Sequence, residues 1–399
     1  MGGLAGAPLG LRWTARAPLA LLLCASLAAP ALADVGPATV ARADRHLWPE
    51  TLNSRNGFDK ASRASILGYV AVLQQMQART DADMTAAFKI KSFNRASVDK
   101  WLKRELALSL QNYQRAARDC MANDFTCVGA VETTGQLLSK AEAWRTTVPP
   151  ALAAWSANLS GFAQAYVSEQ LRLAALFPKV SSEIDRFDEQ REWNGDALED
   201  KQFLLTFDDG PSAAGGSTDD TLAMLAQTKK QGVFFMLGAN LQTRAAKTGV
   251  PALAAMYKNQ CAASHGWEHQ SHAKWEQWQD SVKRTQALLN TTFAKADVLP
   301  YFRPPYGQRT ADSAAFFQQQ GLQVALWNLD SQDWNAHVSA DDVTNRMIAL
   351  MLIKRHGVLL FHDIHAKAKS ALPVIFDELG SAVEWRDCKR AVAEPVKGG

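Results

Sequence analysis

The sequence predicts an α/β protein in which a distorted (β/α) barrel over residues 196–399 is preceded by an all-α helical domain over residues 34–195. Two observations predict the barrel. Short apolar runs of strand type alternate with helical patterns there, and acidic residues or histidines directly follow several of these runs. In the N-terminal part, apolar residues recur at spacings of three and four, which is the period of a helix face.

Residues 1–33 have the pattern of a secretory signal peptide. Arg12 and Arg16 are its only charges, an apolar run follows at residues 19–27, and Ala31-Leu32-Ala33 has the small residues of a cleavage site. We therefore expect export to the periplasm or the medium. No membrane span is expected in the mature protein, and a net charge of only +3 argues against a nucleic-acid partner. The sequence carries no signal for an oligomeric state.

Four cysteines lie beyond the signal peptide, and an exported protein can form disulfides. Of the three possible pairings, we favour Cys120–Cys127 with Cys261–Cys388, because each pair then stays within one predicted domain. The spacing C-x-x-C is absent from the sequence, which argues against a metal site built from cysteines.

The helical domain is expected to pack as a bundle. Three helices can be predicted: one with an apolar face around residues 66–76, a second with Ser97 as its N-cap, and a third after Pro149-Pro150. Aromatic residues of the third helix fall at alternating spacings of three and four, which suits packing into a bundle core. No catalytic constellation is predicted in this domain.

The barrel is expected to contain strands at residues 203–207, 233–237, 324–326 and 358–361, with helices at residues 221–230 and 341–354. In parallel β/α units, ligands bind where the strands end at their carboxyl edge. Polar residues follow three of these strands at that edge: Asp208 and Asp209, then Asp330 and Asp333, then His362 and Asp363.

Five short motifs occur in this half in a fixed order. They are Thr206–Pro211 (TFDDGP), His265–His269 (HGWEH), Arg303–Tyr306 (RPPY), Asp330–Trp334 (DSQDW) and Leu360–His362 (LFH). Together they resemble the polysaccharide deacetylase family, carbohydrate esterase family 4, also called the NodB-homology domain. The resemblance covers residues 200–385, about half of the chain, whereas the helical domain resembles no family that we can name.

The resemblance implies a divalent metal bound by Asp209, His265 and His269. Zinc is favoured, because two imidazoles and one carboxylate leave positions open for water and substrate, while cobalt, nickel and manganese stay open as alternatives. The same ligand set also occurs in non-haem iron oxygenases. The additional carboxylate of Asp208 and the positive charge of Arg303 favour hydrolysis.

The same resemblance implies roles for the residues around the metal. Asp208 would be the general base for the attacking water, and Arg303 would orient it by an ion pair. The backbone N–H of Tyr306 would help to hold the oxyanion of the tetrahedral intermediate.

His362 would be the general acid that protonates the leaving amine. A carboxylate of the fourth motif would keep it protonated, with Asp330 the preferred partner and Asp333 the alternative. Trp334 and Leu360 would line the pocket for the acetyl methyl group.

The function expected from these motifs is metal-dependent removal of N-acetyl groups from an amino-sugar polymer. Peptidoglycan N-acetylglucosamine is the leading substrate, followed by chitin-type oligosaccharides, so the expected partner is a glycan. Three alternatives stay open: an O-acetyl esterase acting on xylan, a small cyclic amide hydrolase, and a glycan-binding module without catalysis. The cyclic-amide alternative is favoured by Gly266, which stands where the family motif usually has Ser or Thr.

Overall fold

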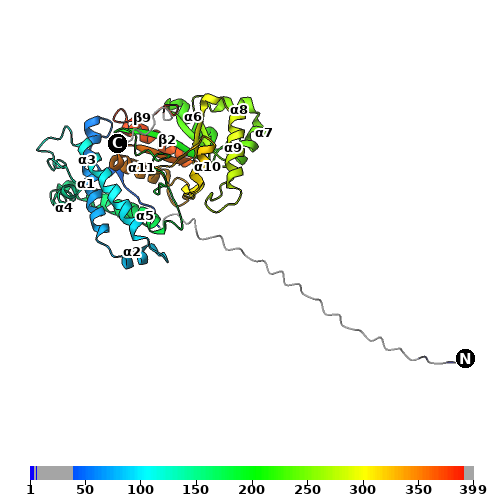
Figure 1. Ribbon diagram of the computed structural model, residues 1–399, viewed down its shortest axis with the longest axis horizontal. Coiled ribbons are helices and arrows are strands. Elements are labelled where there is room, and N and C mark those ends of the chain that lie inside the picture. The colour runs from blue at the N-terminus through cyan, green and yellow to red at the C-terminus, as the bar shows by residue number, and fades with distance from the viewer. Residues whose placement is uncertain (4–5, 7–38, 391–399) are drawn as a thin grey trace. The chain divides into compact units, whose positions relative to one another are not determined.

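The computed structural model describes residues 1–3, 6 and 39–390 of the chain (Figure 1). Apart from residues 1–3 and 6, the predicted signal peptide lies outside the described residues. No described helix has both the length and the apolar character that crossing a membrane requires. The described residues of the segment Pro37–Gly399 belong to one compact unit.

The N-terminal part of this unit is a helical bundle, as predicted. Its long helix α1 packs against α3, α4 and α5. The helices are α1 (Arg55–Gln77), α2 (Asp81–Phe88), α3 (Arg95–Ala116), α4 (Thr134–Trp144) and α5 (Ala153–Leu176), with the 3-10 helices η1 (Arg45–Leu47) and η2 (Pro150–Leu152).

One helix start was predicted at the wrong residue. The N-cap of α3 is Asn94, whose side-chain oxygen accepts a 3.1 Å hydrogen bond from the backbone N–H of Ser97. Ser97 is therefore the third residue of the helix. Asn is as good an N-cap as Ser, and its position three residues earlier satisfies one of the free N–H groups of the first turn.

The C-terminal part contains a parallel sheet that curves into a distorted barrel. The strands pair in the order β1-β6-β5-β4-β3-β2-β8-β7, with β9 pairing to β2, and every pairing is parallel. The strands are β1 (Glu192–Trp193), β2 (Gln202–Asp208), β3 (Gly232–Met236), β4 (Cys261–Ser264), β5 (Val298–Phe302), β6 (Gln323–Ala325), β7 (Leu329–Asp330), β8 (Gly357–His362) and β9 (Glu384–Trp385).

Helices connect most of the consecutive strands, although β1 runs to β2 and β6 runs to β7 without one. The connecting helices are α6 (Ser217–Thr228), α7 (Gly238–Thr248), α8 (Val250–Met256), α9 (Trp278–Thr292), α10 (Ser313–Gln319), α11 (Ala340–Lys354) and α12 (Lys367–Leu379), with the 3-10 helices η3 (Lys295–Asp297) and η4 (Pro305–Gly307). The predicted fold class is therefore confirmed, and the four predicted runs correspond to β2, β3, β6 and β8.

Both predicted disulfides are present. Cys120 and Cys127 close a short loop after α3, and Cys261 of β4 is bonded to Cys388 after β9. Each bridge lies within one of the two predicted parts of the chain.

Helix α11 lies between the barrel and the helical bundle and packs against α1, α3 and α12 (Figure 1). Its side chains are buried on nearly every face, including the polar residues Asn345, Arg346 and Lys354. A helix that is buried all round must pair its charges internally, because an unpaired buried charge is costly. The boundary between the two predicted domains, near residue 195, stays a proposal.

Candidate active site

The carboxyl ends of the barrel strands bring the motif residues together, as expected for parallel β/α units. The residues that close or directly follow strands are Asp208 and Asp209 at β2, His265 at β4, Arg303 at β5, Asp330 at β7 and His362 at β8. His269 and Tyr306 lie on the loops after β4 and β5.

Asp209, His265 and His269 form a group that can hold a metal ion. Their potential ligand atoms all lie within 4.8 Å of one another. Oδ1 of Asp209 is 3.3 Å from Nε2 of His265 and 3.5 Å from Nε2 of His269. This oxygen is buried and accepts no hydrogen bond from any described residue. The donor set of two imidazoles and one carboxylate, with a buried oxygen left unbonded, fits a divalent cation.

Both histidines turn Nε2 toward the carboxylate of Asp209. Nδ1 of His265 lies 2.7 Å from the backbone oxygen of Arg303, which can only accept, so Nδ1 carries a proton and Nε2 is the nitrogen that faces Asp209. Burial lowers the pKa of His269 to about 4, although Asp209 opposes this shift. His265 and His269 are four residues apart but do not lie on a helix. Their motif forms a loop after β4, in which Gly266 has a φ of 84°.

Asp208 is buried beside this group and is held by Arg303. Nη1 of Arg303 donates a 2.7 Å hydrogen bond to Oδ1 of Asp208, and Oδ2 is 3.7 Å from Nε2 of His265. Arg303 is fully buried, and its remaining N–H groups are bonded to the side chain of Thr206 and to the backbone oxygens of residues 325 and 326. Asp208 is thus fixed next to the metal group, with one oxygen turned toward it.

The carboxylate that pairs with His362 is Asp333, so the preference for Asp330 was wrong. Oδ1 of Asp333 lies 2.7 Å from Nδ1 of His362, and Oδ2 accepts a 3.0 Å hydrogen bond from the backbone N–H of His362. Asp330 instead ends the two-residue strand β7, and its carboxylate accepts hydrogen bonds from Gln332. Burial lowers the pKa of His362, but the carboxylates of Asp333, Asp209 and Asp208 together outweigh this effect, Asp333 most of all, and raise the pKa to about 10.

Two exposed aromatic residues belong to the same motifs. Tyr306 is 39% exposed and its ring centroid lies 4.3 Å from that of His269. Trp334 is 37% exposed and directly follows Asp333. Leu360 is buried on β8, two residues before His362, and packs with Trp327 and Val358.

A buried cluster supports the metal loop from its inner side and was not predicted from the sequence. Nε2 of His272 is 3.1 Å from Oγ of Ser281, and this hydroxyl accepts a 2.6 Å hydrogen bond from the backbone N–H of Trp267. A Cβ added to Gly266 would lie 2.7 Å from Cε1 of His272. No local pattern marks this arrangement, because it depends on side chains from α9 packing under the loop.

Comparison with known proteins agrees with the motifs. The model of the polysaccharide deacetylase family matches residues 195–325. The peptidoglycan-N-acetylglucosamine deacetylase PgdA of Listeria monocytogenes is 29% identical over 191 residues, which are 46% of this chain and only 37% of that protein. A peptidoglycan-N-acetylglucosamine deacetylase of Bacillus cereus is 30% identical over 223 residues, which are 52% of this chain and 75% of that protein.

Among solved structures, a peptidoglycan N-acetylglucosamine deacetylase is similar with a TM-score of 0.44 and 23% identity, covering 50% of this chain and 91% of that one. The family match and the identity to the Bacillus cereus protein, most of whose length is covered, confirm the resemblance carried by the five motifs. The chain belongs to the polysaccharide deacetylase family.

Proposed function

We propose that this protein hydrolyses N-acetyl groups of an amino-sugar polymer, with peptidoglycan N-acetylglucosamine as its first substrate and chitin-type oligosaccharides as the second. The observation that carries the proposal is the grouping of Asp209, His265 and His269 next to the Asp208–Arg303 ion pair, with His362, which is paired to Asp333, beside Asp208 on the neighbouring strand. The substrate class is supported by the names of the relatives, two of which are peptidoglycan-N-acetylglucosamine deacetylases.

We propose that Asp209, His265 and His269 hold the metal, with zinc as the preferred ion. When bound there, a divalent metal polarises the acetyl carbonyl and makes a water molecule more acidic. The buried, unbonded oxygen of Asp209 and the Nε2 atoms that both histidines turn toward it support this assignment.

The proton transfers are assigned to Asp208 and His362. Asp208 takes the proton of the attacking water, and its ion pair with Arg303 fixes the direction of its carboxylate. His362 then gives a proton to the leaving amine, and its pair with Asp333 keeps that proton on the imidazole before the reaction. The backbone N–H of Tyr306 is proposed to hold the oxyanion, and Trp334 and Leu360 are proposed to contact the methyl group.

The direct test is acetate release from purified protein. Peptidoglycan, chitooligosaccharides and acetylated xylan would be compared as substrates, each with chelator and with zinc added back, and with His265→Ala as the metal-site control. We expect release from peptidoglycan that the chelator abolishes, zinc restores and His265→Ala lacks. Failure of the zinc-loaded protein to release acetate from either amino-sugar polymer would overturn the proposal, and release from xylan alone would identify an ester substrate.

A further inference from the structure

A buried arginine of α11 connects the helical bundle to the end of strand β7. Arg346 is only 1% exposed, and its Nε donates a 2.8 Å hydrogen bond to the backbone oxygen of Asp330. Its Nη2 lies 2.9 Å from Oε2 of Glu169, a buried residue of α5. Glu169 of the helical bundle thus determines the position of Arg346. Arg346 in turn holds the backbone of Asp330.

Asp330 is the first residue of a turn whose last residue is Asp333, the partner of His362. Oδ1 of Asp330 accepts a 2.8 Å hydrogen bond from the backbone N–H of Gln332, and Oγ of Ser331 accepts one of 3.2 Å from the backbone N–H of Asp333. These two bonds make the turn a short, internally bonded unit. A displacement at the backbone of Asp330 is therefore transmitted to the carboxylate of Asp333, which makes two hydrogen bonds to His362.

The charge of Glu169 is needed because Arg346 has no solvent around it. Nη1 of Arg346 also lies 3.3 Å from Oε1 of Glu169 and donates to the backbone oxygen of Ala41 at 3.3 Å. Without the negative charge, the guanidinium would be a buried cation short of a partner. The negative charge that could then balance the guanidinium is the carboxylate of Asp330, which already raises the pKa of Arg346. If Arg346 moved toward this carboxylate, it would disturb the turn formed by residues 330–333.

We propose that Glu169 is a positioning residue for the reaction: through Arg346 it holds the Asp330–Asp333 turn so that Asp333 keeps its contact with His362. This inference rests on the proposed function and assigns the helical bundle a part in catalysis. Within the described residues Glu169 makes no hydrogen bond or ion pair to the metal group or to His362, so the effect proposed here is transmitted through Arg346 and the turn.

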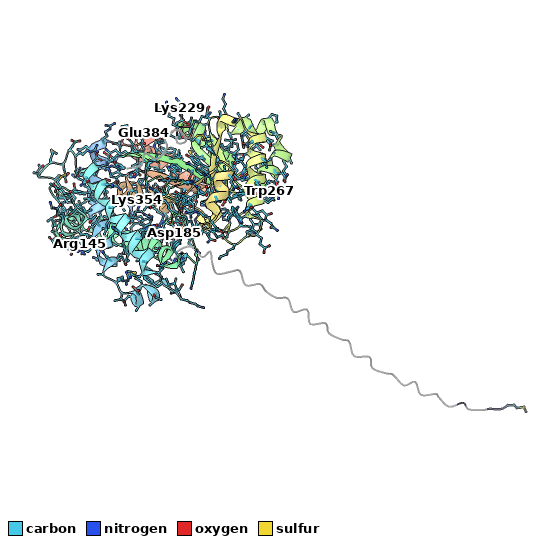
Figure 2. All side chains as sticks on the ribbon, in the orientation of Figure 1. Arg145, Asp185, Lys229, Trp267, Lys354 and Glu384 are labelled. Atoms are coloured by element: carbon cyan, nitrogen blue, oxygen red, sulfur yellow. A yellow bond between two sulfur atoms is a disulfide. The ribbon has the colours of Figure 1, made fainter. Side chains whose placement is uncertain are left out.

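A matched control exists on the same helix. Lys354, in the last turn of α11 and labelled in Figure 2, forms a buried ion pair with Glu105 of α3. Glu105 also accepts a 2.9 Å hydrogen bond from the hydroxyl of Tyr69. This pair joins the same two parts of the protein, but neither member has a hydrogen bond or ion pair to the Asp330–Asp333 turn within the described residues. Glu105→Gln therefore removes a comparable interaction without reaching His362.

The experiment compares Glu169→Gln with Glu105→Gln in the full mature protein loaded with zinc. Acetate release would be followed from pH 5 to 10, and the imidazole of His362 would be titrated by NMR. For Glu169→Gln we expect kcat to fall by about ten-fold or more at nearly unchanged KM. We also expect the alkaline limb of the profile and the titration of His362 to shift to lower pH together. The charged and titratable groups that interact with His362 are Asp208, Asp209, His269, Asp330, Asp333 and His365, and the variants replace none of them.

For Glu105→Gln we expect a loss of thermal stability, but the alkaline limb of the activity profile should stay at the same pH as in the wild-type protein. An unmoved titration of His362 in Glu169→Gln, or the same shift in both variants, would overturn the inference. Arg346→Lys provides a second test if Glu169→Gln does not fold, because it keeps a charge for Glu169 but removes the Nε bond to Asp330, and the same shift is expected. If wild-type protein releases no acetate, the proposed function fails, while the titration of His362 still decides whether Glu169 positions the turn.

Discussion

Asp333→Asn removes the carboxylate that keeps His362 in its charged form. The pKa of His362 is lowered by burial but raised from 6.5 to about 10 by nearby carboxylates, chiefly Asp333 and also Asp209 and Asp208, with Nδ1 of His362 and Oδ1 of Asp333 only 2.7 Å apart. A rise of this size corresponds to on the order of 5 kcal/mol in favour of the imidazolium. Removal of one partner of a buried ion pair costs about 3–5 kcal/mol, so the two magnitudes agree.

In Asp333→Asn the largest effect that opposes burial is lost, while Asp209 and Asp208 still raise the pKa, so His362 should lose its proton at a lower pH than in the wild-type protein. We expect kcat to fall by about 10²–10⁴-fold, the range for loss of a general acid, while the metal stays bound. Stability should change with pH in a defined direction. Because the folded-state pKa is raised, the pair stabilises the wild-type protein fully below pH 6.5, and this contribution is lost as pH rises through about 10.

The assay is acetate release between pH 5 and 10, with metal content and urea unfolding measured on the same samples. Asp330→Asn is the control, since its carboxylate bonds only to Gln332 within the described residues and it should lose far less activity. A larger loss of kcat in Asp330→Asn than in Asp333→Asn would refute the assignment. So would a wild-type pH profile in Asp333→Asn.

Three further changes have defined outcomes. Asp208→Asn should reduce turnover at least about a thousand-fold while zinc, measured by atomic absorption, stays bound; loss of zinc would mean that the two aspartates have exchanged roles. Gly266→Ala should lower the free energy of unfolding by about 2–4 kcal/mol, because φ is 84° and the new Cβ would meet His272. Cys261→Ser with Cys388→Ser opens a bridge between residues 127 apart and should cost about 4–5 kcal/mol in urea unfolding.

The parts of the fold that could be predicted are those with a long local pattern. Strands β2, β3 and β8 are buried apolar runs of five to seven residues, and α1 and α5 repeat their apolar residues over more than twenty positions. Strands β1, β7 and β9 have two residues each, which is too short for any periodicity. Strand β4 has the sequence CAAS, whose small side chains carry little apolar signal.

The error at Asp330 has the same origin as the missed strand β7. When Asp330 is assigned to the loop after β6, it is a plausible neighbour of His362, because motif residues at strand ends are expected to converge. As the last residue of β7, its backbone pairs with β8 and its carboxylate turns to Gln332. The contact of Glu169 with Arg346 could not be predicted at all, since it joins residues 177 apart through side chains on separate elements.

Gly266, the one departure from the family motif, is explained by packing within the protein. A side chain at this position would start 2.7 Å from His272 and 2.9 Å from the hydroxyl of Ser281, both buried beneath the loop. It would therefore point into the interior, where Ser281 already bonds the backbone of Trp267, and away from the face where Tyr306 meets His269. The imidazole of His272 fills the space that a Ser or Thr side chain would need. Gly266 is therefore explained by internal packing and does not indicate which substrate the protein uses. The cyclic-amide alternative loses the observation that favoured it.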